Sequence, residues 1–64
     1  MRTLEEIEKL RRALEAKGYR VVVEGNTLTA TRDGELHRIK VEGGAVHLET
    51  ERPSMDLVEA VLYG

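Results

Sequence analysis

The 64-residue sequence predicts an α+β fold, a two-layer sandwich in which a helix, a four-stranded antiparallel meander and a second helix follow one another. Three dipeptides with the composition of two-residue hairpin turns punctuate the middle of the chain: Gly25-Asn26, Asp33-Gly34 and Gly43-Gly44. Apolar and polar residues alternate between these turns, whereas helical periodicity prevails at both ends. Four strands make a sheet about 19 Å wide, so two helices of about 10 Å each can cover one of its faces.

The first helix is expected over residues 4–17. Thr3 and Glu6 have the spacing of a capping box, in which each side chain can bind the backbone amide of the other. Gly18 follows the segment and suits the left-handed conformation that ends many helices. Apolar residues at helical spacing form the stripe expected to face the core: Leu4, Ile7, Leu10 and Leu14.

Strands are expected over residues 19–24, 27–32, 35–42 and 45–51. The turns fix their register, because a one-residue slip in any hairpin would move its apolar set to the solvent face. The three registers, each taken separately, agree on one inner face: Tyr19, Val21, Val23, Leu28, Ala30, His37, Ile39, Val41, Val46, Leu48 and Thr50. The outer face is mostly polar, and Arg38 lies opposite Glu49 there as a favourable cross-strand pair.

The second helix is expected over residues 54–63. Ser54 suits the cap position after Pro53, and Asp56 suits the first turn. The expected core-facing stripe is Met55, Val58, Val61 and Leu62. Leu57, Ala60 and Tyr63 make the helix apolar almost all round, and such a helix is normally buried on more than one side. The β-branched residues leave a short fifth strand open as an alternative for residues 55–63.

Composition narrows the classes of function that one domain over residues 1–64 can have. The chain carries 10 basic and 12 acidic residues and two aromatic residues, so it lacks the basic, aromatic-rich surface typical of nucleic-acid binding. Cysteine is absent, which excludes thiol chemistry and fits a reducing compartment. No apolar run could span a bilayer or serve as a signal peptide, so a cytoplasmic protein is expected.

No catalytic, metal-binding or cofactor-binding residue is predicted. His37 falls on the inner face at the edge of the core, where a hydrogen-bonded structural histidine is expected rather than a general base. His47 falls on the outer face, so the two histidines cannot share a metal within one chain.

The helix signals, the turn dipeptides and the strict alternation all indicate the same structure. In that concordance the sequence resembles an idealised, de novo designed α+β scaffold, and its motifs match no natural family. The resemblance implies a thermostable monomer with no evolved catalytic activity and no required partner.

Two further hypotheses concern surfaces. The first is a small natural interaction or regulatory module that forms a homodimer through its last helix, with these candidate interface residues: Leu57, Val58, Val61, Leu62 and Tyr63. The second is a weak nucleic-acid-binding module that uses the open face of the sheet, with these candidate contacts: Arg20, Arg38, Lys40 and His47. Acidic residues share that face, which disfavours the second hypothesis.

Overall fold

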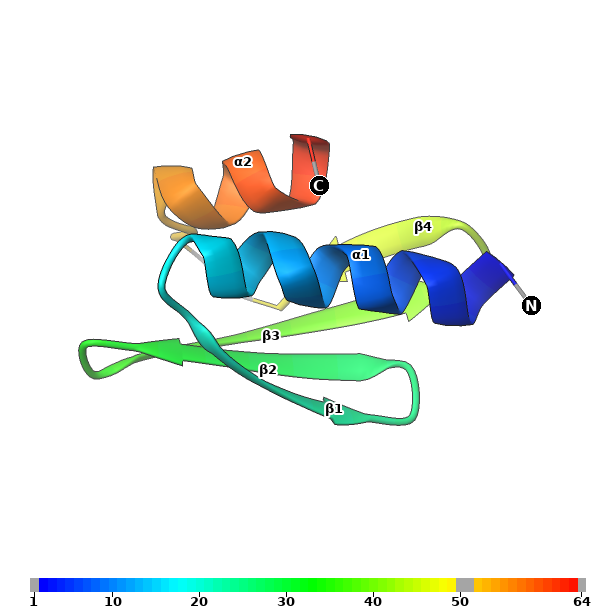
Figure 1. Cartoon of the computed structure of the whole chain (residues 1–64), viewed down its shortest axis with the longest axis horizontal. Helices are drawn as coiled ribbons and strands as arrows, with labels where there is room; N and C mark the ends of the chain where they lie inside the picture. The colour runs from blue at the N-terminus through cyan, green and yellow to red at the C-terminus, as the bar shows by residue number, and fades with distance from the viewer. Residues whose placement is uncertain (1, 50–51, 64) are drawn as a thin grey trace.

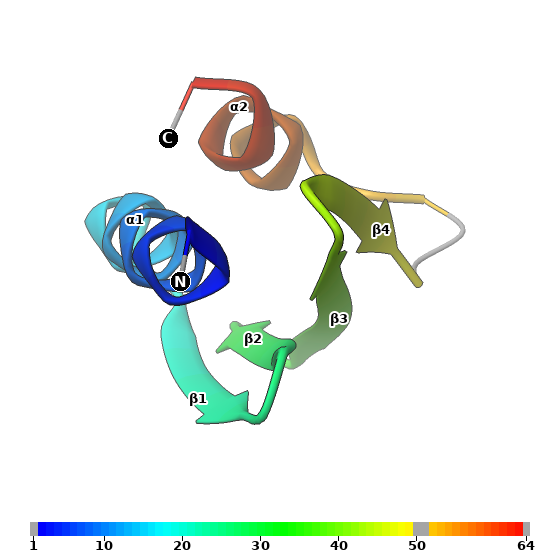
Figure 2. The same ribbon diagram turned by 90° about the vertical axis from the view of Figure 1, so that its right-hand side faces the viewer.

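A computed structural model of the chain describes residues 2–49 and 52–63, and the side chains from residue 4 onward within these ranges. Its elements are α1 (Arg2–Ala16), β1 (Arg20–Glu24), β2 (Thr27–Arg32), β3 (Glu35–Glu42), β4 (Ala45–Leu48) and α2 (Met55–Tyr63). The strands form one antiparallel sheet in the order β1-β2-β3-β4 (Figure 1). Both helices lie side by side on the concave face of this sheet (Figure 2). The predicted fold class is therefore confirmed.

The hairpins have the predicted register. Val23 pairs with Leu28, Leu28 with Ile39, and Ile39 with Leu48. The Asp33-Gly34 turn has positive φ values of 49° and 81°, and the Gly43-Gly44 turn has values of 57° and 83°. Positive φ at both central residues defines the type I′ turn, whose twist matches that of the adjoining strands. The local turn chemistry thus sets the pairing of the whole sheet.

Several element ends differ from the prediction. Helix α1 begins at Arg2, so Thr3 lies inside the helix and not at its cap, and the predicted capping box is wrong. Strand β4 ends at Leu48, although the amide of Glu49 still donates to Arg38 O at 2.9 Å. The side chains of Arg38 and Glu49, both within the described residues, form no ion pair, so the predicted cross-strand pair is absent there. Thr50 and Glu51, predicted as the end of the last strand, lie outside the described residues. Helix α2 confirms the helix predicted after Ser54 and excludes the fifth strand.

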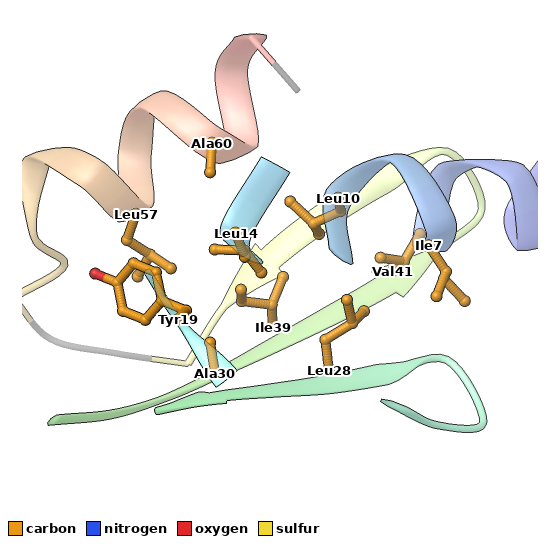
Figure 3. Close-up of a cluster of buried hydrophobic side chains, with 10 residues drawn as sticks. All are labelled: Ile7, Leu10, Leu14, Tyr19, Leu28, Ala30, Ile39, Val41, Leu57 and Ala60. Carbon is orange, nitrogen blue, oxygen red and sulfur yellow. The ribbon is translucent and has the colours of Figure 1, made fainter. Parts of the chain in front are cut away.

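The core lies between the concave face of the sheet and the two helices (Figure 3). Ten buried apolar residues form it: Ile7, Leu10, Leu14, Tyr19, Leu28, Ala30, Ile39, Val41, Leu57 and Ala60. Val23 and Val46 have inner-face register but stay partly exposed, because they lie on the edge strands β1 and β4. No helix in residues 2–49 and 52–63 is long and apolar enough to cross a membrane.

The orientation of α2 corrects the sequence prediction. Leu57 and Ala60 are its buried residues, with Val61 packed against the core, whereas Met55 and Leu62 are exposed. The predicted core-facing stripe was therefore wrong for Met55 and Leu62, whereas Val61 packs against the core and Val58 is half-buried. An apolar pattern on every side gives no preferred face, so contacts with the rest of the chain decide which side turns inward.

Candidate functional site

The best-organised group of polar side chains surrounds Tyr19, where α1 gives way to the sheet. Gly18 has a φ of 92°, and the amide of Tyr19 donates to Leu14 O at 3.1 Å. This left-handed glycine reverses the chain at the end of α1, as the sequence predicts. The reversal places the Tyr19 ring beneath the helices, where it is buried.

Three side chains contact Tyr19 from three different segments. The Arg32 guanidinium carbon lies 4.3 Å from the ring centroid, within the range of a cation–π contact. The His37 ring meets the tyrosine edge-on at 5.9 Å with an interplanar angle of 75°. The Tyr19 hydroxyl shares a 2.5 Å hydrogen bond with Ser54 Oγ. We call these four residues, together with Asp56, which binds Arg32, the Tyr19 cluster.

The Tyr19 cluster attaches α2 to the rest of the protein. Ser54 Oγ accepts the amide of Leu57 at 3.2 Å, which confirms the predicted helix cap. Arg32 Nη1 donates at 2.8 Å both to Asp56 Oδ2 and to the backbone oxygen of Lys17, which joins three segments. Beside the cluster, Lys17 Nζ binds Glu59 Oε1 at 2.8 Å. Both carboxylates of α2 are thus paired with cations of the same chain.

These pairs shift the protonation equilibria in the expected directions. The hydrogen bond from Arg32 lowers the pKa of Asp56, and partial burial opposes that effect. The hydrogen bond to Glu59 raises the pKa of Lys17. The folded protein favours the ionised form of Asp56. The ion pair between Arg32 and Asp56 therefore stabilises the fold fully at pH values above the unfolded-state pKa of Asp, about 3.9.

We therefore expect the pair to lose its contribution as the pH falls through the lowered pKa of Asp56. Asp56→Asn should reduce the melting temperature at pH 7, because the neutral amide forms only the weaker bond to Arg32. Below the lowered pKa, wild type and variant should converge. Thermal melts from pH 7 to pH 2 measure the difference, and Glu24→Gln on an exposed strand end serves as the control. A difference that stays constant down to pH 2 would contradict the assignment.

His37, the remaining member of the cluster, has a carboxylate partner outside the cluster. His37 is buried on the inner face, as its register predicts, and its Nε2 lies 3.1 Å from Glu35 Oε1. Every buried side-chain nitrogen and oxygen in the described residues has a hydrogen-bond partner. Within the same residues, no three His, Asp or Glu side chains lie close enough to hold a metal ion. The geometry of the cluster is that of a structural contact between α2, β2 and β3.

Arg32 is the member of the cluster that sequence reasoning missed. The signal was present, because the alternation that places Leu28 and Ala30 on the inner face of β2 also places residue 32 there. Arg32 lies at the end of the strand, where its guanidinium reaches over Tyr19 to the first turn of α2.

The four residues predicted as open-face contacts all lie on the convex side of the sheet, where Lys40 lies opposite His47 and next to Arg38, and Arg20 lies apart. Arg20 is on β1, Arg38 and Lys40 are on β3, and His47 is on β4. Lys40 Nζ is paired with Glu42 Oε2 at 3.2 Å. Glu24 and Glu49 share the face, so acidic groups are interspersed among the basic ones.

The predicted dimer residues divide into two groups. Leu57 lies in the protein's own core and Val61 packs against it, so Leu57 cannot belong to an exposed interface. Val58 is half-buried, whereas Leu62 is 67% exposed and Tyr63 is 83% exposed. The predicted set omitted Met55, which is also exposed and lies on the same side of the helix as Val58 and Leu62, at i, i+3 and i+7. We call Met55, Val58 and Leu62 the outer stripe of α2.

Comparison with protein-family models, with curated proteins and with solved structures finds no match.

Proposed function

We propose that the protein is a non-catalytic interaction module that forms a homodimer through the outer stripe of α2. The observation that carries this proposal is a helix that is apolar on two opposite sides. Leu57 and Ala60 bury one side in the core, while Met55 and Leu62 leave the other exposed. Contiguous exposed apolar side chains of this kind typically mark an interaction surface.

A second copy of the chain is the partner that suits this surface best. The interface of a two-fold dimer presents the same patch from both subunits, so the patch must be free of uncompensated like charge. Asp56 and Glu59 are the acidic residues of α2, and each is paired with a cation of its own chain. The spacing of the outer stripe is also that of the a and d positions through which helices pair with one another.

A second proposal is that the chain is an idealised scaffold without an evolved partner. The observations that favour it are the type I′ turns, the regular register and the paired buried polar groups. Such consistency between local and global structure characterises designed proteins. This proposal expects a monomer with a melting temperature well above the range of about 45–65 °C typical of mesophilic domains.

Sedimentation equilibrium separates the two proposals. The interaction module should be a dimer at micromolar concentration, and Leu62→Glu should dissociate it because two buried carboxylates would face each other across the two-fold axis. Leu36→Glu is the matched control, since Leu36 is 61% exposed on the opposite side of the molecule. The dissociation constant should rise by at least about tenfold for the first variant and stay unchanged for the second. A wild-type monomer at high micromolar concentration would overturn the dimer and favour the scaffold.

A further inference from the structure

Strand β1 (Arg20–Glu24) forms one edge of the sheet, and within residues 2–49 and 52–63 no strand pairs with its outward side. Figure 2 shows β1 at the margin of the sheet, on the side away from α2. Its sequence contains three consecutive valines, of which Val22 is 55% exposed and Val23 is 40% exposed. Lysine and proline, which often protect edge strands from further pairing, are absent from β1, and its continuous register with β2 contains no bulge.

Two residues of β1 direct their backbone hydrogen-bonding groups outward. In an antiparallel pair, residues that exchange both backbone hydrogen bonds with the partner strand alternate with residues that exchange none. Glu24 is of the first kind, because it flanks a two-residue hairpin loop. Arg20 is of the same kind, and its backbone oxygen lies 3.5 Å from Thr31 Oγ1 of β2. The N–H and C=O groups of Val21 and Val23 therefore point away from β2, toward the free edge.

We propose that β1 pairs antiparallel with β1 of a second copy, in the register that places Val22 opposite Val22. In this register Val21 lies opposite Val23 of the second copy, so their outward groups exchange both backbone hydrogen bonds. The same register sets Arg20 opposite Glu24 at both ends of the paired strands. It does so because β1 carries opposite charges at equal distances from its central residue. Opposite charges in directly facing positions stabilise a pair of strands.

The two charges favour this arrangement over the other ways in which β1 could pair with itself. A shift of two residues would place Arg20 or Glu24 opposite Val22 and would remove the facing charges. A parallel pair in register would set Arg20 beside Arg20 and Glu24 beside Glu24, and like charges in facing positions destabilise a sheet. The antiparallel pair has a two-fold axis and occupies both free edges, so pairing through β1 ends at two copies.

The pairing also covers apolar surface that the single chain leaves open. Val23 has inner-face register opposite the buried Leu28 but is 40% exposed at the edge. In the paired strands its side chain lies on the same face as Val21 of the second copy, directly opposite. The contact is small, because two strands alone are marginally stable in water, so we expect a dissociation constant on the order of 1 mM. The pairing involves no residue of α2 and is independent of the homodimer proposed above.

Exchange of charges between chains tests the register. Every chain in this experiment carries Leu62→Glu, which removes any contribution of the outer stripe of α2. Arg20→Glu chains alone and Glu24→Arg chains alone place like charges at both ends and should not pair at about 1 mM. An equimolar mixture restores opposite charges at both ends and should associate at least about tenfold more tightly than either variant alone. Chemical-shift changes of the Val21 and Val23 amides, with one chain labelled with ¹⁵N, measure the association.

Arg38→Glu is the matched control for the charge exchange. Arg38 is exposed on β3, on the same convex face of the sheet, so its replacement makes the same change of net charge away from β1. Chains with Arg38→Glu and Leu62→Glu should pair through β1 as tightly as chains with Leu62→Glu alone. Far-UV circular dichroism verifies that each variant is folded.

The absence of cysteine allows a second measurement. The Val22 residues of the two copies would form a non-hydrogen-bonded pair with Cα atoms about 4.5 Å apart, a separation that a disulfide can span. In the Leu62→Glu background, Val22→Cys should therefore oxidise to a disulfide dimer at least about tenfold faster than Leu36→Cys. Leu36 is 61% exposed on the same face of the sheet and serves as the control.

Two results would overturn the pairing through β1. One is a charge-exchanged mixture that associates no more tightly than its separate components. The other is equal oxidation of Val22→Cys and Leu36→Cys. Either result would leave the homodimer through α2 untouched, because the outer stripe is inactivated in every chain of both experiments. Conversely, a wild-type monomer at micromolar concentration would overturn the homodimer and leave the weaker β1 pairing to be decided by the mixture at about 1 mM.

Discussion

Leu14→Ala should lower the free energy of unfolding by about 2–5 kcal/mol, the range observed for leucines deleted from well-packed cores. Leu14 has no exposed surface, and its backbone oxygen accepts the amides of both Lys17 and Tyr19 where α1 ends. The lost side chain would leave a cavity between α1, the sheet and α2. A chain of this length has little stability in reserve, so a substantial fraction should be unfolded at 37 °C.

Urea denaturation measures this loss, and the same helix supplies a control. Leu4→Ala removes the same atoms from a leucine that the sequence pattern wrongly placed on the core-facing stripe and that is 71% exposed, so the change in free energy should stay within about 0.5 kcal/mol. Equal losses for the two substitutions would mean that Leu4 and Leu14 are buried to the same extent, which would contradict the packing of α1 described above.

Tyr19→Ala should have an effect of similar size, about 3–5 kcal/mol, because it removes a buried aromatic ring. The ring also carries the contacts of Arg32 and His37, and its hydroxyl binds Ser54. Without it, the polar groups that attach α2 lose their common partner. We therefore expect α2 to show the largest gain in amide hydrogen exchange.

Tyr19→Phe separates the ring from the hydroxyl. It preserves the aromatic contacts and removes one hydrogen bond, so it should cost about 0.5–1.5 kcal/mol, with a further cost if Ser54 is left unpaired. Unfolding by urea gives the magnitude, and hydrogen exchange shows whether the loss is confined to α2. If Tyr19→Phe were as destabilising as Tyr19→Ala, the hydroxyl and not the ring would be the main attachment of α2.

The sheet could be predicted from the sequence because each turn dipeptide determines its own hairpin. Asp33-Gly34 and Gly43-Gly44 supply the positive φ angles that a type I′ turn requires, and the register then follows from a two-residue period. The burial of Ile39 and the outward position of Arg38 needed no knowledge of distant contacts. The turn dipeptides and the two-residue alternation were sufficient to predict the sheet, because each hairpin is formed by residues close together in the sequence.

The orientation of α2 could not be predicted in the same way. Its periodicity offers apolar residues on every side, and the choice of Leu57 over Met55 as the buried residue depends on partners far away in sequence. Arg32 binds Asp56 and Lys17 binds Glu59 across 24 and 42 positions of the chain, so the ionic partners of α2 are distant in sequence as well. The surface proposed for dimerisation is the side of α2 opposite Leu57 and Ala60.

The attachment of α2 also has a consequence for the order of folding. The meander joins neighbours in sequence, whereas Tyr19 and Ser54 are 35 positions apart and Lys17 and Glu59 are 42 apart. Contacts between distant positions require the largest loss of chain entropy and tend to form late. Synthesis proceeds from the N-terminus and the residues of all three hairpins precede Leu57, so we expect the hairpins to pair before α2 docks. Until α2 docks, the nascent chain exposes the apolar surface that Leu57 and Ala60 later cover, and this interval is when the protein is most prone to aggregate.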